Sequence, residues 1–159
     1  MKLQDLIKKL EKQGKIRRQK AGCVQIEGLL RAAILDLEEA CAIASIGVRS
    51  TYMLAYTAML KTGRALLLQC GYVPDDGAQH KTVVEMTAVL LGDRYKELTE
   101  HFEDMRRKRN DLTYEVEVLL TRSESKEALQ SAIELVSKAL EDIKAKNPQM
   151  ELKFEIKKF

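Results

Sequence analysis

The chain is organised around nine residues, 106–114, which read Arg106-Arg107-Lys108-Arg109-Asn110-Asp111-Leu112-Thr113-Tyr114. They interrupt the most regular apolar repeat of the sequence, whose members recur at spacings of three and four: Tyr95, Leu98, Phe102, Met105, Leu112, Val116 and Leu119. This spacing keeps side chains on one face of a helix. Position 109 should complete the repeat, but it holds an arginine. A guanidinium on a buried face is costly unless it is paired or meets polar surroundings.

Two interpretations of Arg109 are open. In the first, its side chain reaches solvent along apolar surface, or pairs with an acidic residue on a neighbouring helix. In the second, Arg109, Asn110 and Tyr114 line a polar cleft, with Asn110 and Tyr114 one turn apart on the same face. Arg109 and Tyr114 are separated by about 140° around an ideal helix. A two-fold pair of such helices would therefore bring them together more easily than one helix can.

The composition indicates an ordinary soluble protein. The chain has 159 residues, of which 45% are hydrophobic and 32% charged, so we expect one domain with a substantial core. No apolar run is long enough to cross a bilayer, and the first residues lack the apolar segment of a signal peptide, so we expect a cytoplasmic protein that does not enter the membrane. The net charge is +3, but residues 1–20 carry eight Lys or Arg against two acidic residues. That net of +6 can indicate a polyanionic partner or a solvated helix face.

Apolar periodicity and capping residues predict an all-α, up-and-down helical bundle. The predicted helices cover residues 2–13, 24–45, 49–70, 79–91, 93–122 and 123–146. The third is apolar nearly all round and should lie at the centre, where its small residues allow close helix packing. We expect three regions: a basic N-terminal helix and linker (1–22), the bundle (23–146) and an extended C-terminal arm (147–159).

The C-terminal arm changes its period. Apolar and charged residues alternate over 150–156, which is strand spacing, and no other strand is expected. This segment should pair with another chain, pack as an extended arm or stay loose. We predict that it is ordered only against another chain or subunit.

Several kinds of chemistry find no support in the sequence. There is no glycine-rich phosphate loop, no nucleophile elbow and no Glu-x-x-His pair. Two histidines, His80 and His101, and three widely spaced cysteines do not form a metal-ligand pattern. We therefore expect neither a metal nor a cofactor.

The arginine stretch also carries a resemblance to a family. Arg109-Asn110 resembles the start of the motif of the HEPN superfamily, an arginine, a polar residue, a short spacer and a histidine. The segment 55–72, "AYTAMLKTGRALLLQCGY", is similar to the alanine- and tyrosine-rich helix of that superfamily, and His80 falls where such proteins often carry a histidine. With a spacer of four, the motif histidine would fall at position 114, where this chain has Tyr114. Tyrosine, with a pKa near ~10, is a poor base at neutral pH.

The resemblance implies a small homodimeric helical bundle that binds RNA or a nucleotide. It also implies a role as the metal-independent ribonuclease toxin of a toxin–antitoxin pair, with a nucleotidyltransferase-like antitoxin as partner. Arg109 and Tyr114 would be the catalytic candidates, and Asn110, Arg106 and Arg107 would bind substrate. The alternative is a non-catalytic helical scaffold in which Arg109 forms a structural ion pair.

Overall fold

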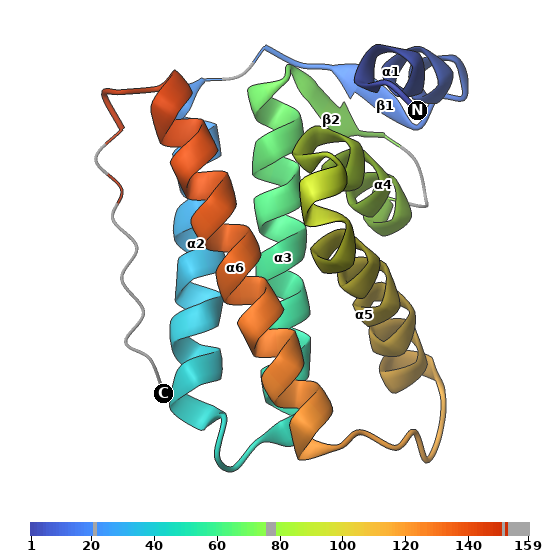
Figure 1. Ribbon diagram of the computed structural model, residues 1–159, viewed down its shortest axis with the longest axis vertical. Coiled ribbons are helices and arrows are strands. Elements are labelled where there is room, and N and C mark those ends of the chain that lie inside the picture. The colour runs from blue at the N-terminus through green and yellow to red at the C-terminus, as the bar shows by residue number, and fades with distance from the viewer. Residues whose placement is uncertain (21, 76–78, 151, 153–159) are drawn as a thin grey trace.

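A computed structural model describes residues 1–20, 22–75, 79–150 and 152. Its elements are, in chain order, α1 (Leu3–Lys12), β1 (Ile16–Arg18), α2 (Cys23–Ile43), α3 (Val48–Gln69), β2 (Tyr72–Pro74), α4 (Gln79–Leu91), the 3₁₀ turn η1 (Asp93–Tyr95), α5 (Lys96–Tyr114) and α6 (Arg122–Lys146). Helices dominate, so the predicted all-α bundle is confirmed (Figure 1).

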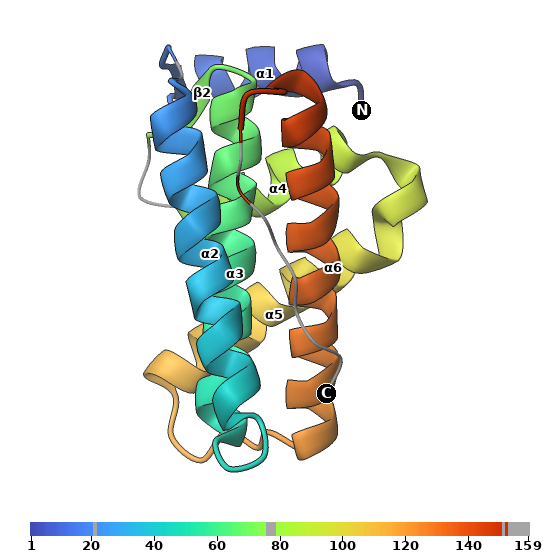
Figure 2. The same cartoon turned by 90° about the vertical axis from the view of Figure 1, so that its left-hand side faces the viewer.

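Helix α3 is the centre of the bundle. Helices α2 and α6 pack along it on one side, while α4 and α5 pack on the other (Figures 1 and 2). Of its 22 residues, 13 are buried, and they lie on all sides of the helix. The sequence predicted that this helix, apolar nearly all round, would lie at the centre of the bundle, and the structure confirms it.

Gly63 sets the distance between α3 and α4. A Cβ atom at this position would lie 2.5 Å from Val83 Cγ1 and 2.7 Å from Thr87 Oγ1. Both distances are well below van der Waals contact, so the two helices can pack this closely only because position 63 has no side chain. This contact brings the first turns of α4, and with them His80, close to α3.

One buried ion pair joins α2 to α3. Asp36 is only 9% exposed, and Lys61 Nζ lies 2.7 Å from its Oδ2 atom. From the sequence Asp36 was expected mostly off the apolar face of α2, because charged residues are rarely buried unless paired. The lysine that pairs with it is 25 residues away, on the next helix.

Helix α5 is shorter than predicted. The apolar repeat indicated a helix from Asp93 to Arg122, but α5 ends at Tyr114, and the exposed fractions of Val116 and Leu119 are 87% and 84%. The reason is visible in the alternation of acidic and β-branched residues after position 114, which favours extended backbone. Glu117 has a φ of 61°, which a helix cannot accommodate.

Long-range contacts fix the end of α5 and the loop after it. The Arg49 guanidinium, from the first turn of α3, donates to the carbonyl of Leu112, one of the last four carbonyls of α5. The Lys108 ammonium donates to the carbonyl of Leu119, at 2.6 Å. These bonds connect segments that the sequence pattern does not relate.

The start of α6 also differs from the prediction. The last helix was predicted to begin at residue 123, but its N-cap is Thr121, whose hydroxyl accepts from the Glu124 amide at 3.0 Å. Glu124 Oε1 accepts in return from the Thr121 amide, at 3.3 Å. The threonine and the glutamate three positions later form a capping box, which leaves Ser123 inside the first turn.

Two short strands contradict the expectation that no strand lies outside the tail. Strand β1 pairs antiparallel with β2, with Ile16 opposite Pro74 and Arg18 opposite Tyr72. The segment 15–20 was predicted as a linker, but its backbone finds partners in the turn after α3. Because Leu6, Leu10 and Ile16 are buried, the basic N-terminal segment is attached to the end of the bundle near α4 (Figure 1).

The predicted C-terminal strand lies mostly outside the described residues. Its two described members, Met150 and Leu152, are each 7% exposed, and Leu152 lines a pocket beside α2. These two residues therefore pack against their own chain, so the prediction that the segment orders only against another chain is wrong for them. Residues 151 and 153–159 belong to the part that the structure does not describe.

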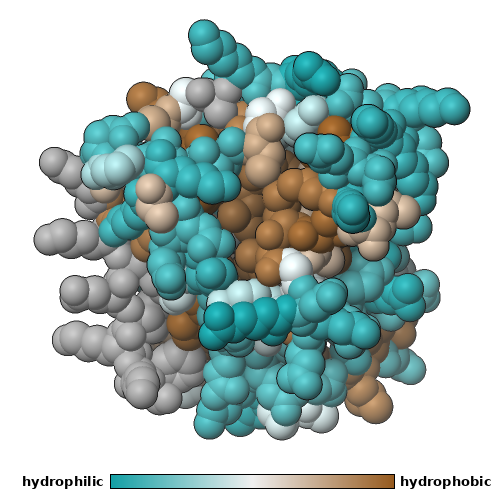
Figure 3. All heavy atoms as spheres, turned by 45° about the horizontal axis from the view of Figure 1, so that its top comes forward, coloured by the Kyte–Doolittle hydropathy of each residue, from teal (hydrophilic) through white to brown (hydrophobic). Residues whose placement is uncertain are grey.

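The face of the molecule drawn in Figure 3 is mainly polar. On the face drawn in Figure 3, one apolar area is surrounded by polar side chains. None of the helices in the described part of the chain combines the length and the apolar composition needed to cross a membrane.

Candidate functional site

Arg109 lies half-buried on α5, one turn after Met105 and one turn before Leu112, both of which are buried. The apolar repeat therefore places its Cα on the inward side of the helix, as predicted. Within the described part of the chain, no ion pair of the Arg109 side chain is found. Its charge acts instead on Tyr56 and His80, as the residue with the largest electrostatic effect on each.

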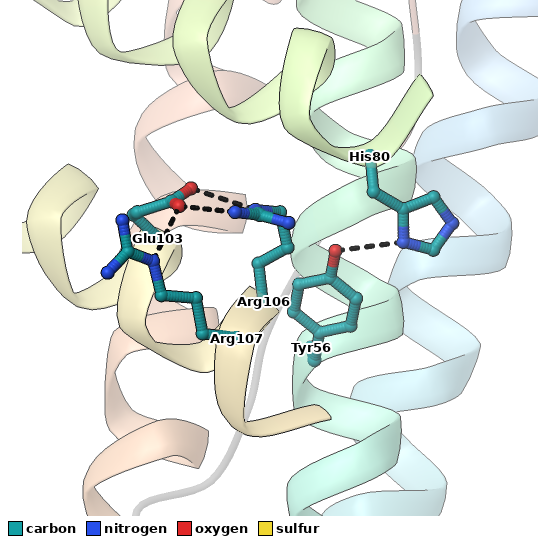
Figure 4. Close-up of polar contacts among 5 residues, drawn as sticks. All are labelled: Tyr56, His80, Glu103, Arg106 and Arg107. Atoms are coloured by element: carbon teal, nitrogen blue, oxygen red, sulfur yellow. Dashed lines mark hydrogen bonds and ion pairs between the residues drawn. The ribbon is translucent and has the colours of Figure 1, made fainter. Parts of the chain in front are cut away.

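Tyr56 and His80, the two residues on which the charge of Arg109 acts, form a hydrogen-bonded pair. The Tyr56 hydroxyl on α3 lies 3.0 Å from Nδ1 of His80, in the first turn of α4 (Figure 4). Tyr56 is almost fully buried, and its ring also packs against Phe102 of α5, with the ring centroids 5.9 Å apart. Three helices thus fix the tyrosine, and the tyrosine fixes the orientation of the half-buried imidazole.

Both members of the Tyr56–His80 pair are uncharged at neutral pH. Burial raises the pKa of Tyr56 to about 12, although the nearby charges of Arg109 and Arg106 act in the opposite direction. Burial also lowers the pKa of His80 below its usual value of 6.5, and the charges of Arg109, Arg64 and Arg106 lower it further. The imidazole is therefore held neutral by its surroundings, with Nδ1 engaged by Tyr56.

Among the described residues, Glu103 is the acidic side chain that pairs with the arginines of this part of α5. It accepts from Arg106 Nε at 2.9 Å and from Arg106 Nη2 at 2.6 Å, and also from Arg107 Nε at 3.1 Å (Figure 4). The hydrogen bonding from Arg106 does most to lower the pKa of Glu103. Arg106 is thereby paired through a bidentate contact, whereas Arg109 has no such partner among the described residues.

Arg64 is the third arginine of the group. Its Nη2 atom donates to the Oε1 atom of Gln79 at 3.3 Å, a neutral partner. Its Nε atom is buried and finds no hydrogen-bond acceptor within the described part of the chain. We call Arg64, Glu103, Arg106 and Arg109, together with the Tyr56–His80 pair, the arginine cluster. Three arginines and one glutamate give it a net charge of +2.

A pocket of about 410 Å³ adjoins the cluster, because Glu103 also lines it. The pocket lies between α1, α4 and α5. Its lining holds three lysines and three glutamates: Lys9, Lys15, Lys81, Glu85, Glu100 and Glu103. Two of these lysines belong to the basic N-terminal segment. Part of the N-terminal positive charge is therefore next to the arginine cluster rather than spread over a separate arm.

Three other sequence-predicted site residues of α5 are exposed to solvent. Asn110 and Arg107 are exposed, and Tyr114, the last residue of the helix, is 72% exposed. The structure thus joins Arg109 to Arg106, Tyr56 and His80, while Asn110 and Tyr114 lie on the solvent side. Arg64 was missed by the sequence analysis. In the sequence it is marked by its position two turns after Tyr56 in the same helix. That position points to the site after the packing of α4 and α5 against α3 is known.

No group of three or more His, Cys, Asp or Glu side chains is arranged to hold a metal ion in the part of the chain that the structure describes. What the arginine cluster can do chemically is bind an anion, through guanidinium donors beside a neutral imidazole. Comparison of the chain with protein-family models and with curated protein sequences finds no match.

The lowered pKa of His80 predicts a specific pH dependence of stability. Between its folded pKa and the ordinary value of 6.5, the unfolded chain binds a proton that the folded chain does not. The free energy of unfolding should therefore fall as the pH drops below about 6.5, and level off below the folded pKa. In His80→Gln this part of the decrease should be absent. Urea unfolding from pH 7.5 to pH 5 measures both slopes, and identical slopes in the two proteins would contradict the assignment.

Proposed function

We propose that this protein is a HEPN-type homodimer that binds RNA or a nucleotide through the phosphate group. Arg109 and Arg64 bind the phosphate, Arg106 lies beside them paired with Glu103, and the Tyr56–His80 pair forms the floor of the site. The form of this function implied by the family resemblance is the ribonuclease-toxin component of a toxin–antitoxin pair, with a nucleotidyltransferase-like partner. A metal-independent activity would then use Arg109, with Tyr114 in the position of the motif histidine.

The observation that carries the proposal is the excess of guanidinium groups at one site. Like charges repel, so three arginines around a neutral pair raise the free energy of the folded protein unless an anion joins them. A single carboxylate, Glu103, is present and is bonded to Arg106 and Arg107. The lysines of the adjoining pocket are matched in number by Glu85, Glu100 and Glu103, so the excess positive charge that favours a phosphate is that of the arginine cluster itself.

A second copy of the chain is the proposed cover for the end of α5. Tyr114, Val116 and Leu119 have exposed fractions of 72%, 87% and 84%, although they are large and apolar or aromatic. Clustered exposed apolar side chains mark interaction sites more often than isolated ones do. In a two-fold dimer formed through this region, the Tyr114 of each protomer could approach the arginine cluster of the other, which one helix cannot achieve alone.

Binding of a labelled single-stranded RNA tests the proposal directly. We expect the wild-type protein to bind it at low salt, with a log–log salt dependence of about −0.7 per phosphate contacted. Lys9→Gln and Lys15→Gln together should make that slope shallower, because they remove two cations of the adjoining pocket but none of the buried N-terminal contacts. Fluorescence anisotropy between about 25 and 200 mM salt, the range in which such contacts become screened, measures both effects.

Sedimentation velocity on the same samples tests the dimer. We expect a dimer at micromolar concentration, converted to a monomer by Val116→Ser with Leu119→Ser. A wild-type protein that binds neither this RNA nor a mononucleotide at the lowest salt would refute the proposed function. A monomeric wild-type protein that still binds RNA would refute only the shared site.

A further inference from the structure

We propose that the arginine cluster selects a terminal phosphate, a phosphomonoester at the end of an RNA strand or on a mononucleotide, over the phosphodiesters inside a chain. This inference rests on the proposed function, since it names the kind of phosphate that the same site takes. The structural basis is the number and pairing of the charges around Tyr56 and His80.

The charge of the site matches a dianion. Arg106 is neutralised by its bidentate pair with Glu103, while Arg64 and Arg109 have no acidic partner among the described residues. Two uncompensated guanidinium groups remain. An internal phosphodiester carries one negative charge, whereas a phosphomonoester carries about −1.5 to −2 at pH 7. A diester would leave one of the two charges unbalanced, and a monoester balances both.

The available donors also match a monoester. A phosphomonoester presents three acceptor oxygens, against two unesterified oxygens for a diester. A guanidinium can donate from several nitrogens at once in a planar fork, and the Arg64 fork donates a hydrogen bond to a neutral partner, Gln79. Two such forks from α3 and α5 supply enough donors for three oxygens. An additional unesterified oxygen would therefore be bonded rather than left desolvated.

The neutral imidazole strengthens the discrimination. His80 uses Nδ1 toward Tyr56, so Nε2 is the ring nitrogen left for a ligand. Burial and the charges of the nearby arginines make a protonated imidazole unfavourable in the empty site, and a bound dianion opposes the part of this penalty that the arginines cause. Binding of a phosphomonoester should therefore be accompanied by proton uptake at His80, and a monoanion should cause less of it.

The test compares oligonucleotides that differ only in their ends. The wild-type protein is titrated with one short RNA sequence carrying a 5′-phosphate, a 3′-phosphate or hydroxyls at both ends, and separately with a mononucleotide 5′-monophosphate and its nucleoside. We expect at least a tenfold tighter Kd for the phosphorylated members. The two sets of titrations show which molecule carries the terminal phosphate. Tighter binding of the mononucleotide alone indicates a nucleotide ligand. Tighter binding of RNA phosphorylated at one end identifies that end. Either of these supports the inference.

Substitutions show which arginines produce the preference for a terminal phosphate. Arg64→Gln and Arg109→Gln should each reduce the ratio of affinities to about twofold or less, while Arg31→Gln, an exposed arginine of α2, should leave it unchanged. A melting curve identifies any variant that does not fold. The comparison of ligands on the wild-type protein tests the inference without the variants.

Equal affinity for phosphorylated and unphosphorylated RNA, still dependent on Arg109, would overturn this inference and leave the proposed function intact. Absence of binding by every ligand would overturn both. In the wild type, an unchanged NMR titration of His80 with saturating phosphomonoester would also count against the inference.

Discussion

Gly63→Ala should lower the free energy of unfolding by roughly 1–3 kcal/mol, the usual cost of adding a methyl group to a closely packed contact. The added Cβ would lie 2.5 Å from Val83 Cγ1, on a β-branched side chain that is itself fully buried. Neither Val83 nor Thr87 can move aside without shifting α4. The gain in helix propensity from glycine to alanine, up to about 1 kcal/mol, offsets only part of this cost.

Gly28→Ala is the matched control, because Gly28 is an interior helical glycine and a Cβ added there would meet no atom within 4 Å. At this position the propensity term acts alone, and stability should rise by about 0.5–1 kcal/mol. Opposite signs in the two variants, measured by chemical denaturation, are the expected result. If Gly63→Ala is stabilised as much as Gly28→Ala, the helices α3 and α4 are not packed as closely as described. Displacement of α4 in Gly63→Ala should also weaken RNA binding, since α4 carries His80.

Arg109→Ala should weaken RNA binding strongly while leaving stability almost unchanged. If Arg109 were a structural ion-pair partner, its removal would leave a buried acid and cost about 3–5 kcal/mol. The structure places it beside Arg64 and Arg106 instead, with no acidic partner within the described part of the chain. Removal therefore relieves repulsion, and the free energy of unfolding should stay within about 0.5 kcal/mol or rise. Loss of a charge-assisted contact worth about 1.5–3 kcal/mol should weaken binding by at least tenfold.

Thermal melting and RNA titration on the same preparations separate the two roles of Arg109. Arg31→Ala serves as the control for the removal of one positive charge, since Arg31 is exposed and pairs with Glu27 on its own helix. A large loss of stability in Arg109→Ala with unchanged RNA binding would favour the scaffold interpretation. It would also mean that the partner of Arg109 lies outside the described residues or on another chain.

The local patterns of this sequence predicted the helices well. Helix α4 covers 79–91 as predicted, and the ends of α2, α3 and α6 lie within two residues of the predicted ends. Apolar spacing and helix-stopping residues act over a few positions, so they can be recognised without knowledge of the fold. The main error, at the end of α5, has the same origin. Val116 and Leu119 continue the spacing by chance, and apolar spacing alone does not show that a partner helix is present.

The candidate site was only half predictable. Arg109 was recognised because it interrupts a repeat, and His80 because the family resemblance includes a histidine at that place. Neither observation indicates that the two share one site with Tyr56 and Arg64. Positions 56, 64, 80 and 109 come from three helices, and their association depends on the close approach at Gly63 and on the packing of Phe102 against Tyr56.

By itself, then, the sequence determined which segments are helical, which faces are apolar and that Arg109 is an exception on such a face. Those properties depend on side-chain spacing along a single helix. Only the tertiary structure decided that Lys61 neutralises Asp36, that Arg49 caps α5 and that Arg109 meets a neutral Tyr56–His80 pair rather than an acid. Electrostatic energy depends on distances between groups far apart in the chain, and these distances exist only after the helices have packed.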